Sequence, residues 1–441
     1  MKLMVKTYRL LFEILLLLIA VTCAAAQTPL WTHTASSQST TDQVVDLALS
    51  KNGATVALGG SSFSILNKTG AEFGSFLQAN SVGMSTDGTR IAAAMDDGIH
   101  VFFPNGTARW SAGTEPMVHV AVSGDGGTVV TGDKQGTLQI YNGTGSKVGA
   151  TAVIKKESTT VLNLATTRNG SVIAATDSQG LYLYTRAGKV RWKTDFDTPS
   201  ALALAANGTL VIIGGSHSVL LYNATNTSAE KVGEYDTGGR VDSLATSTDG
   251  TRTVAGTEDK KVTLLDETGD VIWSNPTGDW ANLVALSDDA SVIAAGSMDK
   301  KVQVFFQNGT LRWGYDLSTR PTALAVSGDG TSIGVGCEDG TSYLFTTAIT
   351  PNKTSTVKNA TVAKNGTSTN KTATINATAA KNGTPSNKTV AVNITPAKNG
   401  TRNNTSEVLT VATDPQKSPM PLLPAVLAAL GFVALLSRRR L

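Results

Sequence analysis

Residues that could carry chemistry are sparse in this chain of 441 residues. The four histidines lie far apart and show no metal-ligand spacing: His33, His100, His119 and His217. The Asp-Gly pairs lack the Asp-x-Asp-x-Asp spacing of a calcium loop, so we interpret them as hairpin turns. A phosphate-binding Gly-Lys-Ser/Thr loop is also absent from the sequence. These patterns predict neither a metal site nor a catalytic centre, and they indicate no cofactor.

One recurring position could bind a ligand. It lies nine residues before the Asp or Asn of a repeated turn, and three consecutive copies hold Arg240, Trp280 and Arg320. Asp242 and Asn282 follow two residues after the first two of these. Paired guanidinium donors beside an indole face suit an anionic or carbohydrate group. We hypothesise a ligand site here. The alternative is an ordinary polar rim, in which the arginines pair with Asp279 and Asp242.

The elements that would position these residues come from an internal repeat. A short strand of small and apolar residues, as in Leu324-Ala-Val, is followed by an Asp-Gly or Asn-Gly turn and a second apolar strand. The turn recurs eight times, at residues 53, 88, 126, 170, 208, 250, 290 and 330, so the period is about 40 residues. Such a period of short strands and turns is typical of β-propeller blades with four strands each. The sequence therefore predicts an all-β propeller.

The ends of the array indicate how the ring closes. Four repeats finish with a Gly-x-x-x-Trp segment, ending at Trp110, Trp192, Trp273 and Trp313. The eighth repeat lacks this strand, whereas Trp31 stands in an isolated copy near the start of the chain. We expect the strand around Trp31 to complete the last blade, so that no sheet edge stays open. Eight blades are expected, or seven if the first copy belongs elsewhere.

Both ends of the chain resemble membrane signals. Residues 1–26 combine early lysines with an apolar run and Ala24-Ala-Ala, which predicts a signal peptide cleaved before Gln27. Residues 418–441 contain an uncharged apolar stretch followed by three arginines, which predicts a transmembrane anchor with a cytoplasmic C-terminus. Cys337 is then the single cysteine of the mature chain. We expect it to be a packed strand residue, because no intramolecular disulfide can form.

Between the predicted propeller (27–349) and the anchor lies a segment, 350–417, of different composition. It is rich in Asn, Thr, Ala and Lys, and residues 351–407 contain no aromatic side chain, so it cannot bury enough surface to fold. We predict a disordered, glycosylated stalk. In an exported chain, each of its Asn-x-Ser/Thr triplets is an acceptor for N-linked sugar. The eleven acceptors are Asn352, Asn359, Asn365, Asn370, Asn376, Asn382, Asn387, Asn393, Asn399, Asn403 and Asn404.

The propeller segment itself contains eight further triplets. They begin at Asn67, Asn105, Asn142, Asn169, Asn207, Asn223, Asn226 and Asn308. Several coincide with Asn-Gly turns, so either glycosylation or turn chemistry explains them.

These motifs resemble known families. The repeats are similar to WD40-like and quinoprotein-like propellers, and the Gly-x-x-x-Trp segments look like the tryptophan motif of quinoprotein repeats. The order of leader, propeller, Asn/Thr stalk, apolar segment and arginines is similar to that of archaeal, methanogen-type surface proteins. The C-terminus resembles a sorting signal for archaeosortases but has Ser418-Pro-Met-Pro in place of Pro-Gly-Phe. Processing and simple anchoring both stay open.

From these features we expect a non-catalytic cell-surface protein that binds a protein or glycan partner through its propeller. The propeller segment has 22 Lys and Arg against 31 Asp and Glu, so its acidity disfavours nucleic acid. A quinoprotein-like oxidoreductase is one alternative, although near-minimal blades and a single cysteine leave no room for that family's insertions and vicinal disulfide. A structural, lattice-associated envelope protein is the other.

Overall fold

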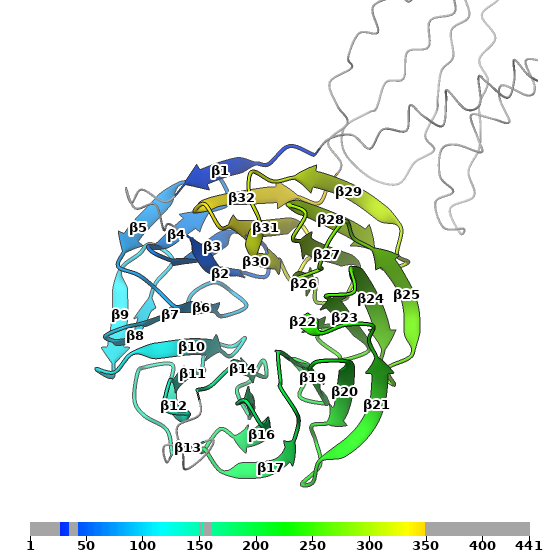
Figure 1. The fold of residues 1–441 in the computed structure, drawn as a ribbon. Coiled ribbons are helices and arrows are strands. Elements are labelled where there is room, and N and C mark those ends of the chain that lie inside the picture. Colours follow the sequence, from blue (N-terminus) through cyan, green and yellow to red (C-terminus); the bar gives the residue numbers. More distant parts are fainter. Residues whose placement is uncertain (1–26, 35–42, 150–151, 154–159, 349–441) are drawn as a thin grey trace, which may run out of the picture. The chain divides into compact units, whose positions relative to one another are not determined.

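The computed structural model describes residues 27–34, 43–149, 152–153 and 160–348. All of them lie within the first of two units into which the chain divides, residues 1–355 and 356–441. The predicted leader, stalk acceptors and anchor lie outside the described residues. The described part is all-β and contains eight antiparallel sheets of four strands each. Figure 1 shows these sheets arranged around a central axis as a closed ring. The eight-bladed prediction is thus confirmed, and the seven-bladed alternative is wrong.

Each blade runs from the centre of the ring outward. The innermost strands are β2 (Val44–Leu49), β6 (Ser81–Met84), β10 (Met117–Val122), β14 (Asn163–Thr166), β18 (Ala201–Leu204), β22 (Val241–Thr246), β26 (Leu283–Leu286) and β30 (Pro321–Val326). The second strands are β3 (Thr55–Gly60), β7 (Ile91–Met95), β11 (Thr128–Asp133), β15 (Val172–Thr176), β19 (Leu210–Gly214), β23 (Arg252–Thr257), β27 (Val292–Ser297) and β31 (Ser332–Cys337).

The outer half of each blade is built in the same way. The third strands are β4 (Phe63–Asn67), β8 (Gly98–Phe102), β12 (Thr137–Asn142), β16 (Gly180–Thr185), β20 (Ser218–Asn223), β24 (Lys261–Asp266), β28 (Lys301–Phe306) and β32 (Thr341–Thr346). The outermost are β5 (Glu72–Phe76), β9 (Ala108–Ala112), β13 (Ala152–Val153), β17 (Val190–Asp195), β21 (Glu230–Asp236), β25 (Val271–Pro276), β29 (Leu311–Asp316) and β1 (Trp31–Thr34). We number the blades one to eight from β2 onward.

The ring closes as the sequence predicted. Strand β1 pairs antiparallel with β32, placing Trp31 opposite Leu344 and Thr34 opposite Thr341. Blade eight therefore combines three strands from the end of the array with one from its beginning. This arrangement leaves no gap between the first and last blades, because both ends of the propeller share one sheet.

The core lies between the blades. Eight clusters of buried apolar side chains fill the interfaces of neighbouring blades in the described region. Small residues dominate near the axis, where the strands crowd. A Cβ on Gly83 would lie 3.2 Å from Cγ2 of Val122 in the next blade. Farther out the blades diverge and aromatic side chains fill the space, as in the 5.3 Å ring contact of Trp313 with Phe345.

The other tryptophans of the repeated segment make the same contact across their own interfaces. Their ring centroids lie 5.6 Å from Tyr141 for Trp110, 5.9 Å from Tyr222 for Trp192 and 5.6 Å from Phe305 for Trp273. These tryptophans therefore pack each blade against the next. Cys337 is buried in the same way, and burial raises the pKa of its thiol to about 12.

Candidate functional site

Strand alternation sorts the connections of the propeller onto two faces. Chain segments that join one blade to the next, and those that join second to third strands, lie at one end of the sheets. We call this end the loop face. Turns between first and second strands, and between third and fourth strands, lie at the other end, which we call the turn face. The two faces follow from antiparallel pairing within every blade.

The predicted arc lies on the loop face, in three adjacent blades. Arg240 and Arg320 directly precede the innermost strands β22 and β30, and Trp280 lies three residues before β26 in the equivalent connection. Their backbone environment is equivalent, because each carbonyl oxygen accepts a hydrogen bond from the amide 18 residues later. These bonds are Glu258 to Arg240 at 2.9 Å, Met298 to Trp280 at 2.9 Å and Glu338 to Arg320 at 3.0 Å. The three side chains are exposed, and 43% of Trp280 is accessible to solvent.

The guanidinium of Arg240 is already held by carboxylates. It lies 3.5 Å from Asp242 and 3.8 Å from Glu258. Burial raises the pKa of Asp242, and the charge of Arg240 partly opposes that rise. An anionic ligand at Arg240 would have to compete with both carboxylates. This local pairing is the arrangement that the polar-rim alternative describes.

The next connection along the ring carries a second ion pair. Lys260 lies 3.2 Å from Asp279, the residue before Trp280. The hydrogen bond from Lys260 lowers the pKa of Asp279, and the charge of Arg320 lowers it further. Trp280 therefore stands in a chain of alternating charges that runs across three blades. An exposed indole in such a setting presents an apolar surface with a polar surround, as protein interfaces do.

Asn282 and Asp242 lie beneath the rim, and Asn282 helps to align the blades. Its Nδ2 donates to the carbonyl oxygen of Pro321 in the next blade. Three other interfaces use the same position for the same bond: Asn80 to Met117, Ser200 to Val241 and Thr322 to Val44. Asp242 occupies the equivalent place in blade six, within a bulge of β22. A carboxylate cannot donate this bond, so the interface between blades six and seven lacks it.

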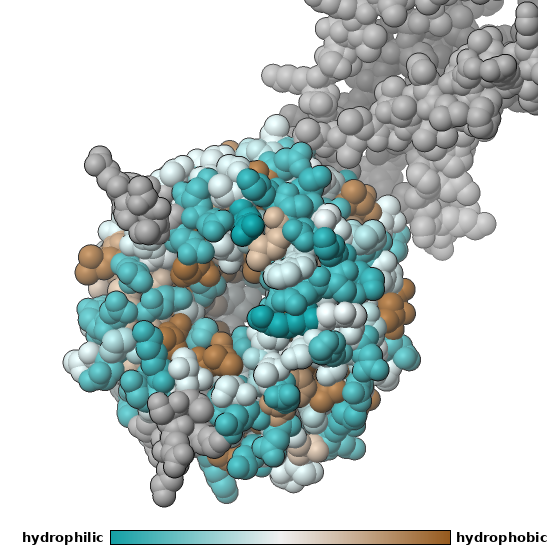
Figure 2. Space-filling view, in the orientation of Figure 1, coloured by the Kyte–Doolittle hydropathy of each residue, from teal (hydrophilic) through white to brown (hydrophobic). Residues whose placement is uncertain are grey.

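Acidity is the general property of the loop face. Its described connections contain eleven Asp and Glu against five Lys and Arg. The carboxylates are Asp96, Asp97, Glu115, Asp177, Asp197, Glu258, Asp259, Asp279, Asp299, Glu338 and Asp339. The described connections of the turn face are nearly balanced, with eight acidic and seven basic residues. Figure 2 shows hydrophilic side chains gathered around the central opening near β22, and hydrophobic ones near β10.

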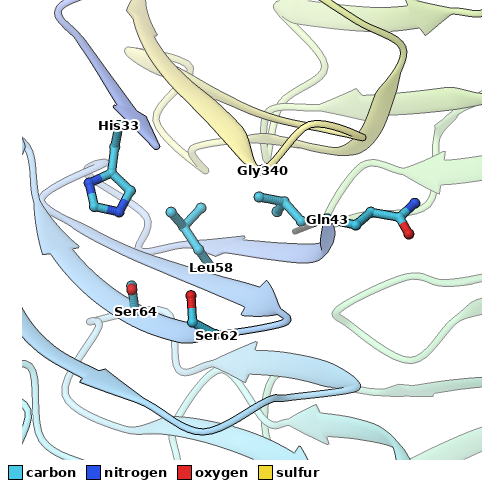
Figure 3. A pocket seen from close by; sticks show the side chains of 7 residues that line it. His33, Gln43, Leu58, Ser62, Ser64 and Gly340 are labelled. Carbon is cyan, nitrogen blue, oxygen red and sulfur yellow. The ribbon is translucent and has the colours of Figure 1, made fainter. Parts of the chain in front are cut away.

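A small cavity lies between blades eight and one. His33, Gln43, Leu58, Ser62 and Ser64 line it together with Val44 and Gly340 (Figure 3). Its volume is about 10 Å³. A single water molecule needs about that much space, so the cavity admits no larger ligand.

On the turn face, a belt of backbone hydrogen bonds joins every blade to the next, with lengths of 2.8–3.1 Å. The pairs of donating amide and accepting carbonyl are Lys51 and Thr86, Thr86 and Gly124, Asp125 and Arg168, Arg168 and Ala206, Asn207 and Thr248, Thr248 and Asp288, Asp288 and Gly328, and Asp329 and Lys51. The belt is closed, because the last bond returns to the first blade.

Inside this belt, near the central axis, charged side chains join blades that are not neighbours in the ring. Asp288 of blade seven accepts from Lys51 of blade one at 2.7 Å and from Arg168 of blade four at 3.2 Å. Sequence reasoning missed this cluster, although all three residues hold the same position of the repeat. Beside it, Lys51, Asn52, Thr86, Asp87 and Gly124 line an open hollow of about 390 Å³.

The remaining chemistry-bearing residues are dispersed. Among the described residues, no three His, Cys, Asp or Glu side chains gather as a metal site. The Asp-Gly pairs form hairpin turns, as interpreted from the sequence. Asp87, for example, accepts hydrogen bonds from the amide of Thr89 at 2.9 Å and from the hydroxyl of Ser85 at 2.6 Å. The described residues include no helical segment with the length and hydropathy of a membrane span.

No protein-family model matches the sequence, and none of the curated proteins is significantly similar to it. Solved structures show similarity of fold. The computationally designed protein Ika8 is 16% identical, with a TM-score of 0.59 over 70% of this chain and 98% of its own. Sqt1 from Chaetomium thermophilum is 13% identical, with a TM-score of 0.62 over 73% of this chain and all of its own. Another Sqt1 structure, bound to the N-terminus of ribosomal protein L10, covers 69% with a TM-score of 0.61. The chain thus shares the β-propeller fold of these structures.

Proposed function

We propose that this protein is a non-catalytic recognition protein of the cell surface, and that its loop face binds a protein partner. The observation that carries the proposal is the exposed Trp280 between Arg240 and Arg320 in three adjacent blades. Tryptophan and arginine are the residues that most often dominate the binding energy of protein interfaces. Because the indole of Trp280 is exposed on a rigid ring, a role in binding a partner explains it better than a role in packing the blades together.

The charges of the loop face indicate the chemistry of the partner. The carboxylates around the arc outnumber the cations, and Arg240 is neutralised by Asp242 and Glu258. A partner with basic side chains and an apolar pocket for Trp280 would complement this surface. Opposite potentials also accelerate association and exclude partners of like charge. A free anion is a poorer candidate, since it would displace existing ion pairs.

The fold gives a precedent for peptide binding. Sqt1, which shares the propeller fold, has been solved with the N-terminus of ribosomal protein L10 bound. A terminal peptide segment is therefore one form that the partner could take. The identity between the two chains is 14%, so the precedent concerns the architecture and not the contacts.

The sequence around the propeller supports presentation at the surface. A leader at 1–26, a stalk at 350–417 and an apolar segment at 418–441 together suit an exported chain held at the membrane. Fully extended, the stalk would reach roughly 200 Å at about 3.1 Å per residue. The propeller would then stand well clear of the lipid, with its faces accessible to partners outside the cell.

Photo-crosslinking on intact cells tests the proposal. A photoreactive lysine analogue replaces Lys300 on the loop face or, as a matched control, Gln307 on the turn face of the same blade. We expect a discrete protein adduct from position 300 and none from 307. The adduct should decrease when Trp280→Ala is added. Equal adducts from both positions, or an adduct indifferent to Trp280, would contradict the proposal.

Labelling of the same cells tests the location separately. A membrane-impermeant amine reagent should modify the lysines of the full chain without cell lysis. Labelling that occurs only after lysis would refute surface presentation, whatever the crosslinking shows.

A further inference from the structure

The glycosylation triplets of the propeller are arranged on one side only. Eight Asn-x-Ser/Thr triplets occur within the described residues, and every one begins on the turn face. Asn169 and Asn207 lie in turns between first and second strands. The others lie at turns between third and fourth strands: Asn67, Asn105, Asn142, Asn223, Asn226 and Asn308. No described triplet begins on the loop face.

The side-chain geometry leaves the asparagine Nδ2, the atom that would carry the sugar, accessible at most of these positions. At Asn105 the carbonyl Oδ1 accepts from the amide of Thr107 at 3.1 Å and from its hydroxyl at 2.7 Å. These bonds fix the side chain through its oxygen. Nδ2, the atom to which an N-linked sugar is joined, has no partner among the residues that the structure describes. The same holds at five other positions, where Oδ1 accepts from the amide two residues later: Asn67, Asn142, Asn169, Asn223 and Asn308.

Two of the eight differ. Nδ2 of Asn207 donates to the carbonyl oxygen of Asp249 in the next blade at 3.1 Å. Nδ2 of Asn226 donates to the carboxylate of Glu230. A sugar on either nitrogen would crowd an existing contact. These two positions are therefore less suited to modification than the other six.

Turn geometry alone does not require asparagine at these places. The turns that begin at Asp249 and Asp329 have the same Gly-Thr continuation, and their carboxylates accept from the amide two residues later at 3.0 and 2.9 Å. Aspartate therefore also forms this turn. The loop face contains two Gly-Thr turns of its own, and they begin with Gln135 and Asp339. Neither of these is an acceptor.

We propose that N-linked oligosaccharides cover the turn face at Asn67, Asn105, Asn142, Asn169, Asn223 and Asn308, and that the loop face carries none. This inference rests on the proposed export of the chain, because the glycosylating enzymes act on exported proteins. Bulky, solvated sugars at five outer turns and one inner turn exclude large partners from that face. The loop face, with Trp280, is then the one broad face on which a protein can dock.

Glycopeptide mass spectrometry of the full chain, purified from the membranes of its source cells, tests the inference. We expect sugar at the six asparagines and lower occupancy at Asn207 and Asn226. Unmodified propeller asparagines beside glycosylated stalk peptides would overturn the inference and leave export standing. Unmodified asparagines in both segments would also overturn the inference, and the labelling of intact cells would then decide the proposed export by itself.

A matched pair of variants checks one site directly. Thr107→Ala removes the hydroxyl that the triplet requires, whereas Thr107→Ser keeps it, and both leave Asn105 in place. We expect Thr107→Ala to lose the mass of one glycan and Thr107→Ser to keep it. Identical masses for the two variants would show that Asn105 is not an acceptor.

Discussion

The loop face and the turn face of this propeller are built from the same eight sheets, yet the blades are joined differently at each end. At the turn face a closed belt of backbone hydrogen bonds links all eight blades. At the loop face, backbone bonds such as Val241 to Gly215 join some neighbouring blades. Further links come from side chains that vary, such as Asn282 and Thr322, and blade six has Asp242 at that position instead. A backbone hydrogen bond forms with almost any residue type at the position, whereas a side-chain hydrogen bond needs a residue that can donate or accept it. The turn face can therefore hold the ring together while the loop face varies.

This difference implies that the turn face mainly stabilises the ring and that the loop face mainly binds the partner. Substitutions on the turn face should change stability more than recognition, and substitutions on the loop face should do the reverse. Loops positioned by a rigid scaffold are the usual place for binding residues. The exposed Trp280 and the excess of carboxylates on the loop face agree with that division.

The largest expected effect is on stability at the turn face. A Cβ on Gly53, where φ is +62°, would lie 2.3 Å from Oγ of Ser332 in the neighbouring blade. Gly53→Ala should therefore lower the free energy of unfolding by about 3 kcal/mol, from backbone strain and overpacking together. Denaturant unfolding of the purified full chain measures the change.

The matched control lies on the loop face of the adjoining blade. Gly340 has φ of +76°, and Lys300 and Lys260 occupy the equivalent turns with φ of +65°. A Cβ is thus accommodated there, and Gly340→Ala should cost about 1 kcal/mol. Equal losses for the two variants would remove the structural distinction between the faces.

The second effect concerns binding. Trp280→Ala should weaken the affinity for the partner captured at position 300 by about 30-fold, equivalent to about 2 kcal/mol for an interface anchor. The free energy of unfolding should change by less than about 0.5 kcal/mol, since the indole is exposed. Phe306→Ala on the turn face is the control and should leave affinity unchanged. A Trp280→Ala variant with undiminished affinity would remove Trp280 from the interface.

The third effect is a pH dependence of opposite sign at two carboxylates of blade six. The hydroxyl of Ser247 lowers the pKa of Asp249 on the turn face, whereas burial raises the pKa of Asp242 near the loop face. The stability contributed by Asp249 is present above the unfolded pKa of about 3.9 and is lost as pH falls through the lower folded value. For Asp242, stability is present below the unfolded pKa and is lost as pH rises through the higher folded value.

Two variants test this contrast. At neutral pH, Asp249→Asn should destabilise the protein and Asp242→Asn should stabilise it, each by no more than about 1 kcal/mol after solvent screening. The side-chain amide of an asparagine at 242 would also donate a hydrogen bond to the next blade, as the side-chain amide of Asn282 does. Both differences should shrink on acidification toward pH 3, measured by thermal unfolding of protein from a host that does not glycosylate. The same sign for both variants would contradict the assigned environments.

The smallest effect is expected at the mouth of the channel. Asp288 binds Lys51 and Arg168, but all three side chains are partly exposed. Asp288→Ala should therefore cost less than about 1 kcal/mol, and the loss should diminish in high salt. A loss that is larger and insensitive to salt would mean that this ion pair, and not the backbone belt, holds the turn face together.

Much of the fold could be predicted from the sequence because the repeat is local. The turn glycines, the small inner-strand residues and the isolated Trp31 strand each follow from neighbouring residues, and together they predict eight blades and their closure. The placement of Arg240, Trp280 and Arg320 on one rim follows from the same period. The alternation of strands would also have placed all eight propeller triplets on one face.

The partners of the site residues could not be predicted in the same way. Glu258, which holds Arg240 with Asp242, lies in a different connection, 18 residues along the chain. The contact of Arg168 with Asp288 spans three blades, so it depends on the diameter of the closed ring. Such contacts arise from how the blades are set around the axis, which repeat spacing alone does not fix.

A pair of introduced glycans tests the central claim most directly. Asp329 and Asp339 begin identical Asp-Gly-Thr turns on opposite faces of blade eight, so Asp329→Asn and Asp339→Asn each create one acceptor with the same change of charge. We predict that sugar at 339 abolishes the adduct from position 300 and that sugar at 329 leaves it intact. Asp339→Asn combined with Thr341→Ala, which carries no sugar, should restore the adduct. An adduct that survives the glycan at 339, or is lost with the glycan at 329, would contradict the account.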